Sequence, residues 1–147
     1  MTAARSILGV MMLLACGACG GSTTGPSPAE ITGSWSYTHS ASGSGTTCSE
    51  AGTMNLQAND SRIAGVFEGR GGCQGASQAL DYMKTGDAFG RVVGDSIELT
   101  LSSQLESCLY RGRFAGGATS AQGSVVCTPA NGAAAREGSW GMSRITR

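Results

Sequence analysis

Four cysteines and one histidine are the side chains of this chain that could form cross-links or bind a metal within a folded domain. The cysteines are Cys48, Cys73, Cys108 and Cys127, and His39 is the only histidine among the 147 residues. A structural zinc site needs four such ligands and usually takes two of them from a C-x-x-C pair. No two of these four cysteines have that spacing. We therefore expect no metal site and predict two disulfide bonds, which require an oxidising compartment.

Catalysis has weak support in the sequence. Residues 75–79 (GASQA) resemble the nucleophile elbow G-x-S-x-G but lack its second glycine. A Ser-His-Asp arrangement would have to use His39, and no motif places that histidine near a serine. The glycines of residues 69–72 (GRGG) are not followed by the Lys-Ser/Thr pair of a phosphate-binding loop. We therefore expect a protein that is not an enzyme, with no catalytic residue and no cofactor.

The first fifteen residues have the properties of an export signal. Arg5 provides a positive charge, and residues 7–14 form an apolar run that is too short to span a bilayer. The sequence LLAC that ends at Cys16 resembles the lipobox of bacterial lipoproteins, which implies cleavage before Cys16 and lipidation of its thiol. Two alternatives remain. A cut before Cys19 would put a cysteine at −3, where an aliphatic residue is expected, and an ordinary signal peptide would carry no lipid.

The lipobox resemblance also implies a location. A chain lipidated at Cys16 is attached to the cell envelope, and Gly17 rather than Asp at the second position implies the outer membrane where the host has one. Residues 16–30 are rich in Gly, Ser, Thr and Pro, so we expect a flexible tether. Residues 31–147 then form one domain.

The charge of the chain argues against one class of partner. Ten basic and ten acidic side chains balance, and removal of the signal takes away only Arg5, so nothing favours nucleic acid. The distribution is uneven, because five arginines follow Cys108. Such a split either steers an anionic partner to one face or is an ordinary solvated surface. These arginines are Arg111, Arg113, Arg136, Arg144 and Arg147.

Two hairpins choose the pairing of the cysteines. When the chain is folded about Asp60 and Ser61, alternating apolar residues face one another, with Met54 opposite Phe67, and the same register sets Cys48 opposite Cys73. When it is folded about Gly117 and Ala118, Tyr110 lies opposite Val125, and Cys108 lies opposite Cys127. Directly opposed residues of antiparallel strands are close enough for a disulfide. We therefore predict the disulfides Cys48–Cys73 and Cys108–Cys127.

A third hairpin follows the same rule without cysteines. Gly94 and Asp95 form a two-residue turn signal that pairs Val92 with Ile97 and sets Arg91 opposite Glu98. Residues 74–86 are ambiguous between a short strand and a helical turn. We expect an all-β fold, an antiparallel up-and-down meander of about eight strands closed into a small barrel, with a two-layer β-sandwich as the alternative. The expected strands are 33–39, 48–58, 62–73, 87–93, 96–102, 108–116, 119–127 and 137–145.

The ends of the domain resemble those of calycins, the lipocalin- and avidin-like barrels. Gly33-Ser34-Trp35 matches the G-x-W motif that opens the first lipocalin strand, and Arg144 lies in the last strand, where such proteins carry an arginine. The resemblance implies that Trp35 lies on the barrel floor beneath Arg144. Two tryptophans are too few for the biotin pocket of avidins, so biotin binding is not implied.

Aromatic side chains on the inward faces are the candidate ligand contacts. Either they fill the core, or small inward residues such as Gly65, Gly90, Gly112 and Gly123 leave room for a small apolar or aromatic ligand. The alternative function is a protein-interaction module, for example a periplasmic protease inhibitor, since small bacterial metalloprotease-inhibitor barrels are similar in size and meander. The candidate ligand-facing residues are Tyr37, His39, Phe67, Tyr110 and Phe114.

Overall fold

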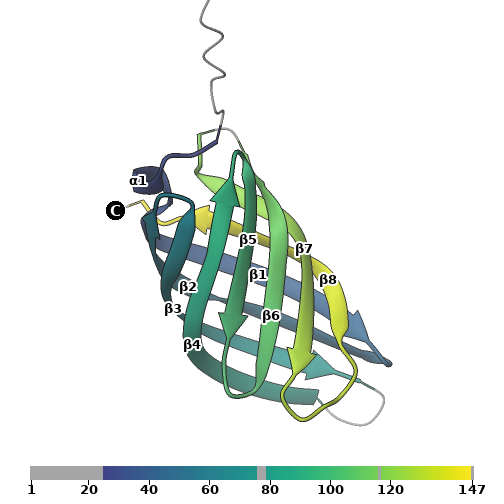
Figure 1. Cartoon of the computed structure of the whole chain (residues 1–147). Helices are drawn as coiled ribbons and strands as arrows, with labels where there is room; N and C mark the ends of the chain where they lie inside the picture. Colours follow the sequence, from purple (N-terminus) through teal and green to yellow (C-terminus); the bar gives the residue numbers. More distant parts are fainter. Residues whose placement is uncertain (1–24, 76–78, 116, 147) are drawn as a thin grey trace, which may run out of the picture.

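A computed structural model describes residues 25–75, 79–115 and 117–146. Within them the strands form one closed antiparallel barrel in which each strand pairs with the next and the last pairs with the first (Figure 1). This confirms the predicted all-β meander and excludes the sandwich. The strands are β1 (Gly33–Gly43), β2 (Thr46–Asn59), β3 (Arg62–Gln74), β4 (Ala79–Val93), β5 (Ser96–Ser102), β6 (Glu106–Phe114), β7 (Ser120–Pro129) and β8 (Arg136–Arg144).

The three predicted hairpin registers are confirmed residue by residue. Met54 pairs with Phe67 between β2 and β3, Val92 with Ile97 between β4 and β5, and Tyr110 with Val125 between β6 and β7. Both predicted disulfides are present, each between directly opposed residues whose Cα atoms lie 4.0 Å apart. Each links two adjacent strands. If one strand slipped by a single residue, the two sulfur atoms would lie on opposite faces of the sheet.

Two segments differ from the sequence prediction. The ambiguous stretch 74–86 is strand from Ala79 onward, which makes β4 the longest strand with 15 residues; residues 76–78 lie outside the described residues. The predicted tether 16–30 ends in a short helix, α1 (Pro28–Ile31). Pro28 opens this helix, and the Ser27 backbone N–H donates to the Glu30 carboxylate at 2.7 Å. The predicted signal and the tether up to residue 24 lie outside the described residues.

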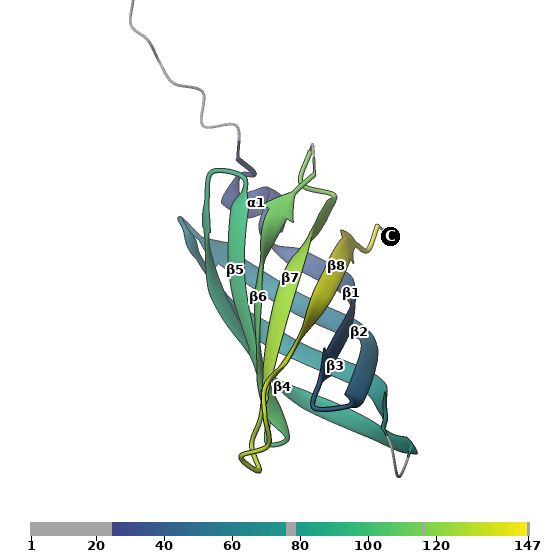
Figure 2. The ribbon, with the colours of Figure 1, turned by 90° about the vertical axis from the view of Figure 1, so that its right-hand side faces the viewer.

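Helix α1 closes one end of the barrel, which we call the apolar end. Ile31 is buried, and its carbonyl accepts a hydrogen bond of 2.8 Å from Trp35 Nε1. The Arg144 guanidinium lies 5.7 Å from the centre of the Trp35 ring and donates to the Thr32 carbonyl. The predicted stacking of Arg144 on Trp35 is therefore present, and it joins the first and last strands. Figure 2 shows α1 and the C-terminus at this same end.

Aromatic side chains fill the barrel interior next to three inward glycines, Gly52, Gly86 and Gly112. A Cβ on Gly52 would lie 2.7 Å from the Tyr37 ring. One on Gly86 would lie 2.9 Å from the Phe67 ring, and one on Gly112 would lie 3.0 Å from the Trp140 ring. These glycines therefore allow a close approach both of the adjacent strand, whose backbone oxygens would collide with each added Cβ, and of aromatic rings from other strands. Of the two interpretations left open by the sequence, these contacts favour the filled core.

Candidate functional site

Four charged side chains from alternate strands form a chain across the barrel interior at the end opposite α1, which we call the polar end. Lys84 Nζ of β4 lies 2.8 Å from Glu50 Oε2 of β2 and 2.7 Å from Glu106 Oε1 of β6. Arg136 of β8 binds the other oxygen of Glu106. The side chains of Glu50, Lys84 and Glu106 are at most 5% exposed. Two carboxylates thus face two cations, which compensates the high cost of burying isolated charges.

Two tyrosines extend this ionic chain. The Tyr37 hydroxyl donates to Glu50 Oε1 at 2.5 Å. A Cβ on Gly69 would collide with both groups, so only glycine fits beneath them. The Tyr82 hydroxyl lies over Gly71 in the same way, where a Cβ would be 2.6 Å away. The ionic chain therefore depends on β3 having no side chains at these two positions.

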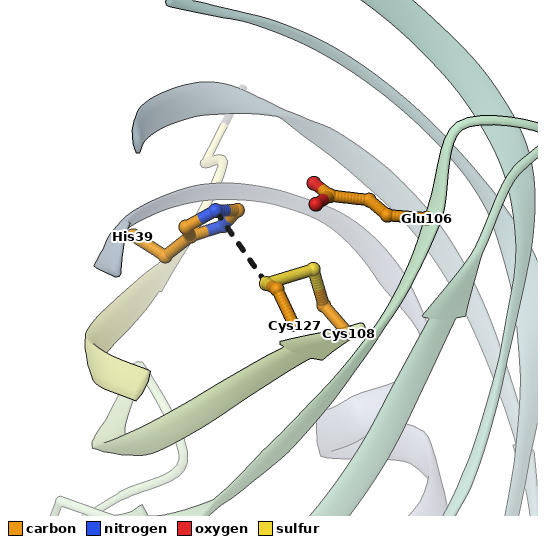
Figure 3. Close-up of side chains that lie close together, drawn as sticks. All are labelled: His39, Glu106, Cys108 and Cys127. Carbon is orange, nitrogen blue, oxygen red and sulfur yellow. Dashed lines mark hydrogen bonds between the residues drawn. A yellow bond between two sulfur atoms is a disulfide. The ribbon is translucent and has the colours of Figure 1, made fainter. Parts of the chain in front are cut away.

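His39 lies beside the ionic chain and against a disulfide. Its Nδ1 shares a hydrogen bond of 2.8 Å with the Tyr110 hydroxyl, and its Nε2 lies 3.9 Å from Cys127 Sγ. Figure 3 shows the imidazole directed at the Cys108–Cys127 bridge, with the Glu106 carboxylate close by. The ring is held on both sides by groups of the protein.

Burial and charge shift the pKa values of this cluster. Desolvation lowers the pKa of His39 below its ordinary value of 6.5, so the imidazole is neutral near pH 7. For Glu106, burial would raise the pKa, but the hydrogen bond from Lys84 and the charges of Lys84 and Arg136 outweigh burial and lower it. Burial, and then the neighbouring carboxylates, raise the pKa values of Tyr37, Tyr82 and Tyr110, so all three stay protonated.

Two buried donors of the polar end, the Tyr82 hydroxyl and Arg136 Nε, make no hydrogen bond of good geometry within the described residues. Glu50 Oε2 also lacks a bond of good geometry, but Lys84 Nζ lies 2.8 Å away and neutralises it. A groove of about 490 Å³ opens beside Tyr82, lined also by Arg70, Gly71, Asp81 and Met83. Buried polar groups are nearly always satisfied in proteins, so the candidate partners of these donors are water, an acceptor atom of a ligand or, for the Tyr82 hydroxyl, Glu50, whose hydrogen bond contributes to the raised pKa of Tyr82.

The five predicted ligand-facing residues all point into the barrel, but they do not form one group. Tyr37 and His39 belong to the polar end, where Tyr37 binds Glu50 and His39 binds Tyr110. Phe67 packs edge-on against Tyr37, whereas Phe114 packs against Trp35 at the apolar end. Each is at most 9% exposed. Whether any of them contacts a ligand stays a prediction.

Sequence reasoning missed the charged residues of the polar end, although the signal was present. Side chains two residues apart in a strand share a face. Glu50 is two residues from Cys48 and Glu106 is two from Cys108, so the predicted disulfides already placed both glutamates inside. Arg136 and Lys84 follow the same parity on β8 and β4, as their buried contacts show. Tyr82 could not be placed, because its segment had no clear pattern.

Comparison with known proteins adds little to this geometry. No protein-family model matches the chain, and no curated protein does. Among solved structures it is similar to the S-type phycobiliprotein lyase CPES from Guillardia theta, at 10% sequence identity and a TM-score of 0.45. The match covers 81% of this chain and 90% of that one. A likeness this distant assigns no ligand or activity to the chain.

The same match corrects one expectation. The sequence led us to expect a protein that is not an enzyme, whereas the similar barrel bears the name of a lyase. The expectation that the protein is not an enzyme is therefore withdrawn. Within the described residues, no helix is long and apolar enough to cross a membrane.

Proposed function

We propose that the protein is an exported lipoprotein, anchored through Cys16, whose barrel binds a small molecule at its polar end. The lipobox supports the anchor. The described chain enters the barrel at the apolar end, where Gly25 passes against Gly94 of the β4–β5 turn. A tether attached there leaves the polar end directed away from the membrane.

Tyr82 is the observation that carries the binding function. Its half-buried ring lines the groove on β3 and β4, while its buried hydroxyl has no partner and lies beside the ionic chain. A ligand with an aromatic or apolar body would pack against Met83 on the outer face. A carboxylate or carbonyl oxygen on it would accept a hydrogen bond from the Tyr82 hydroxyl once that ring turns out of the interior toward the groove. The groove falls within the usual size range of small-molecule sites. Since the interior is packed at the positions described above, this groove is a better place for a ligand than the barrel axis.

Binding of small aromatic acids tests this function. Benzoate and indole-3-acetate, titrated calorimetrically into the purified protein, should bind to wild type. Tyr82→Phe removes one hydrogen bond to the ligand, so it should raise the dissociation constant about fivefold, the equivalent of roughly 1 kcal/mol. Phe89→Leu, an exposed aromatic change on the outer face of the same strand, is the matched control and should leave affinity unchanged. Equal affinity of wild type and Tyr82→Phe would show that the ligand binds at a site away from Tyr82.

The anchor needs its own test. Cells given labelled palmitate should label the wild-type protein and the Cys19→Ser variant but not Cys16→Ser. Loss of label in Cys19→Ser alone would place the lipid on the second cysteine. If the wild-type protein took up no label, residues 1–15 would be an ordinary signal peptide without lipidation.

A protein partner is the second candidate, favoured by apolar side chains on the outer face of β3 and β4. Val66, Met83, Phe89 and Val93 are each at least half exposed, which is more apolar surface than a solitary exposed residue provides. Inhibition through a free N-terminal plug fits less well, because Ile31 of α1 is packed into the barrel end. A titration against a zinc metalloprotease tests the inhibitor form: Phe89→Ser should weaken inhibition if this face is used.

A further inference from the structure

Four donor side chains meet at one point beneath the polar end. His39 comes from β1, Glu106 and Cys108 from β6, and Cys127 from β7. One donor atom of each lies within 4.8 Å of the other three, and all four residues are buried (Figure 3). In the oxidised protein the two sulfur atoms are bonded to each other and cannot act as thiolate ligands.

We propose that reduction of the Cys108–Cys127 disulfide turns this cluster into a tetrahedral Zn²⁺ site. A dithiol reductant gives two electrons and two protons to the disulfide, which becomes two thiols while the reductant becomes a disulfide. Zn²⁺ then displaces both thiol protons and is bound by two thiolates, the His39 imidazole and one Glu106 oxygen. Zinc prefers four ligands of these kinds. Donors at zinc–ligand lengths of about 2.0–2.3 Å are separated by roughly 3.3–3.8 Å, so only small movements of the side chains are needed.

The orientation of His39 supports the proposal. Its Nε2 already faces the Cys127 sulfur at 3.9 Å, and its Nδ1 is held by Tyr110 at 2.8 Å. Metal-binding histidines are usually fixed in this way, with the other ring nitrogen in a hydrogen bond that selects the tautomer. In the zinc form Nδ1 carries the proton and donates it to the Tyr110 oxygen, which leaves the Nε2 lone pair for the metal.

Charge balance also permits a buried metal. In the oxidised protein the charges of Glu50 and Glu106 are matched by those of Lys84 and Arg136. Zn²⁺ replaces two thiol protons, so binding adds no net charge to this interior, and the large penalty for an uncompensated buried ion does not arise. Lys84 and Arg136 contact the two Glu106 oxygens and orient the carboxylate, as hydrogen-bond partners of metal ligands commonly do.

The other disulfide provides an internal comparison. Among the described residues, this cluster is the one group of His, Cys, Asp and Glu side chains whose donor atoms lie close enough together to bind one metal ion. Cys48 and Cys73 do not belong to it. The two disulfides are otherwise alike, since each joins opposed residues of adjacent strands. A zinc site at one but not the other therefore depends on His39 and Glu106.

Zinc titration of the reduced protein is the test. All proteins in this test carry Cys16→Ser/Cys19→Ser, because this C-x-x-C pair could itself bind Zn²⁺, and wild type here means the chain without any further change. The purified full chain is reduced with a phosphine in mild denaturant, returned to buffer without oxygen, and titrated with Zn²⁺ while native mass spectrometry counts the bound ions. Reduced wild type should bind one Zn²⁺ per chain, and oxidised wild type should bind none. A paired Cys48→Ala/Cys73→Ala variant should still bind one, whereas Cys108→Ala/Cys127→Ala should bind none. His39→Gln should weaken binding at least about tenfold.

Co²⁺ provides a second readout, because its absorption reports the type of ligand and the coordination geometry. A tetrahedral site with two thiolates gives visible ligand-field bands and a thiolate-to-cobalt absorption in the near ultraviolet. Should the reduced chain unfold without metal, the same titration followed by tryptophan circular dichroism should show refolding, as in small zinc domains. The proposal is overturned if reduced wild type neither binds nor refolds with the metal, or if binding persists in Cys108→Ala/Cys127→Ala.

Discussion

The two ends of the barrel are filled according to different rules. At the apolar end Trp35 packs against Phe114 and α1 covers the opening, so burial of apolar surface stabilises the structure. At the polar end Lys84 and Arg136 hold two buried glutamates, and a disulfide lies next to His39. At the apolar end, the free-energy cost of a substitution should rise with the side-chain volume that it removes. The polar end tolerates a change only if its charges still balance.

This difference matters because buried ions seldom add stability relative to apolar residues of the same shape. The polar end, with its shifted pKa values and unpartnered Tyr82 hydroxyl, has the features of functional sites. Binding, or a metal site that forms on reduction, therefore accounts for such a cluster better than stability does.

The largest effect is expected at the centre of the polar end. Lys84→Ala leaves Glu50 and Glu106 buried without their shared cation and opens a cavity, so the free energy of unfolding should fall by at least about 3–5 kcal/mol. Urea unfolding measures it. The triple change Lys84→Met/Glu50→Gln/Glu106→Gln, which removes the charges together, should recover most of the loss. A mild effect of Lys84→Ala would mean that water reaches the ion pairs.

Trp35→Ala should cost about 3–5 kcal/mol, which is the minimum expected for Lys84→Ala, because a large buried ring is lost but no charge is left unpaired. The comparison with Trp35→Phe separates packing from the hydrogen bond to Ile31 and the contact with Arg144. Thermal unfolding followed by circular dichroism measures both. An unchanged melting temperature for Trp35→Ala would contradict a floor role for this residue.

Sequence periodicity explains why the fold could be predicted and the polar end could not. The hairpins of β2–β3, β4–β5 and β6–β7 have clear turns and a period of two, so their registers and both disulfides followed from the residues. The polar end joins Glu50, Lys84, Glu106 and Arg136 from four strands that are distant in the chain. Which inward charges meet across a barrel depends on closure and strand stagger, which one-dimensional patterns do not contain.

Acid titration should act on the polar end before the apolar end. His39 has a pKa lowered by burial, so the unfolded chain takes up its proton first as the pH falls below about 6.5, and stability decreases from there toward the folded-state pKa. The pKa of Glu106 is also lowered, so protonation of this carboxylate decreases stability further as the pH falls below its ordinary pKa of 4.5. Urea midpoints between pH 8 and 3 measure both steps. In His39→Gln the first step should disappear and the second should remain.

The smallest effect should come from the exposed ion pairs on the outer surface, which have the same charges as the polar end but lie in water. Arg91 and Arg111 contact Glu98 at 3.5 and 2.9 Å, and their side chains are 66% and 62% exposed. Water and salt screen such pairs, and holding long side chains in place costs entropy. Glu98→Gln should therefore shift the urea midpoint less than any change above, and the shift should vanish in 1 M NaCl. The loss from Lys84→Ala should persist in that salt, because buried pairs are screened much less. If both variants responded equally to salt, the charges of the polar end would be solvated, and the distinction between the two ends would fail.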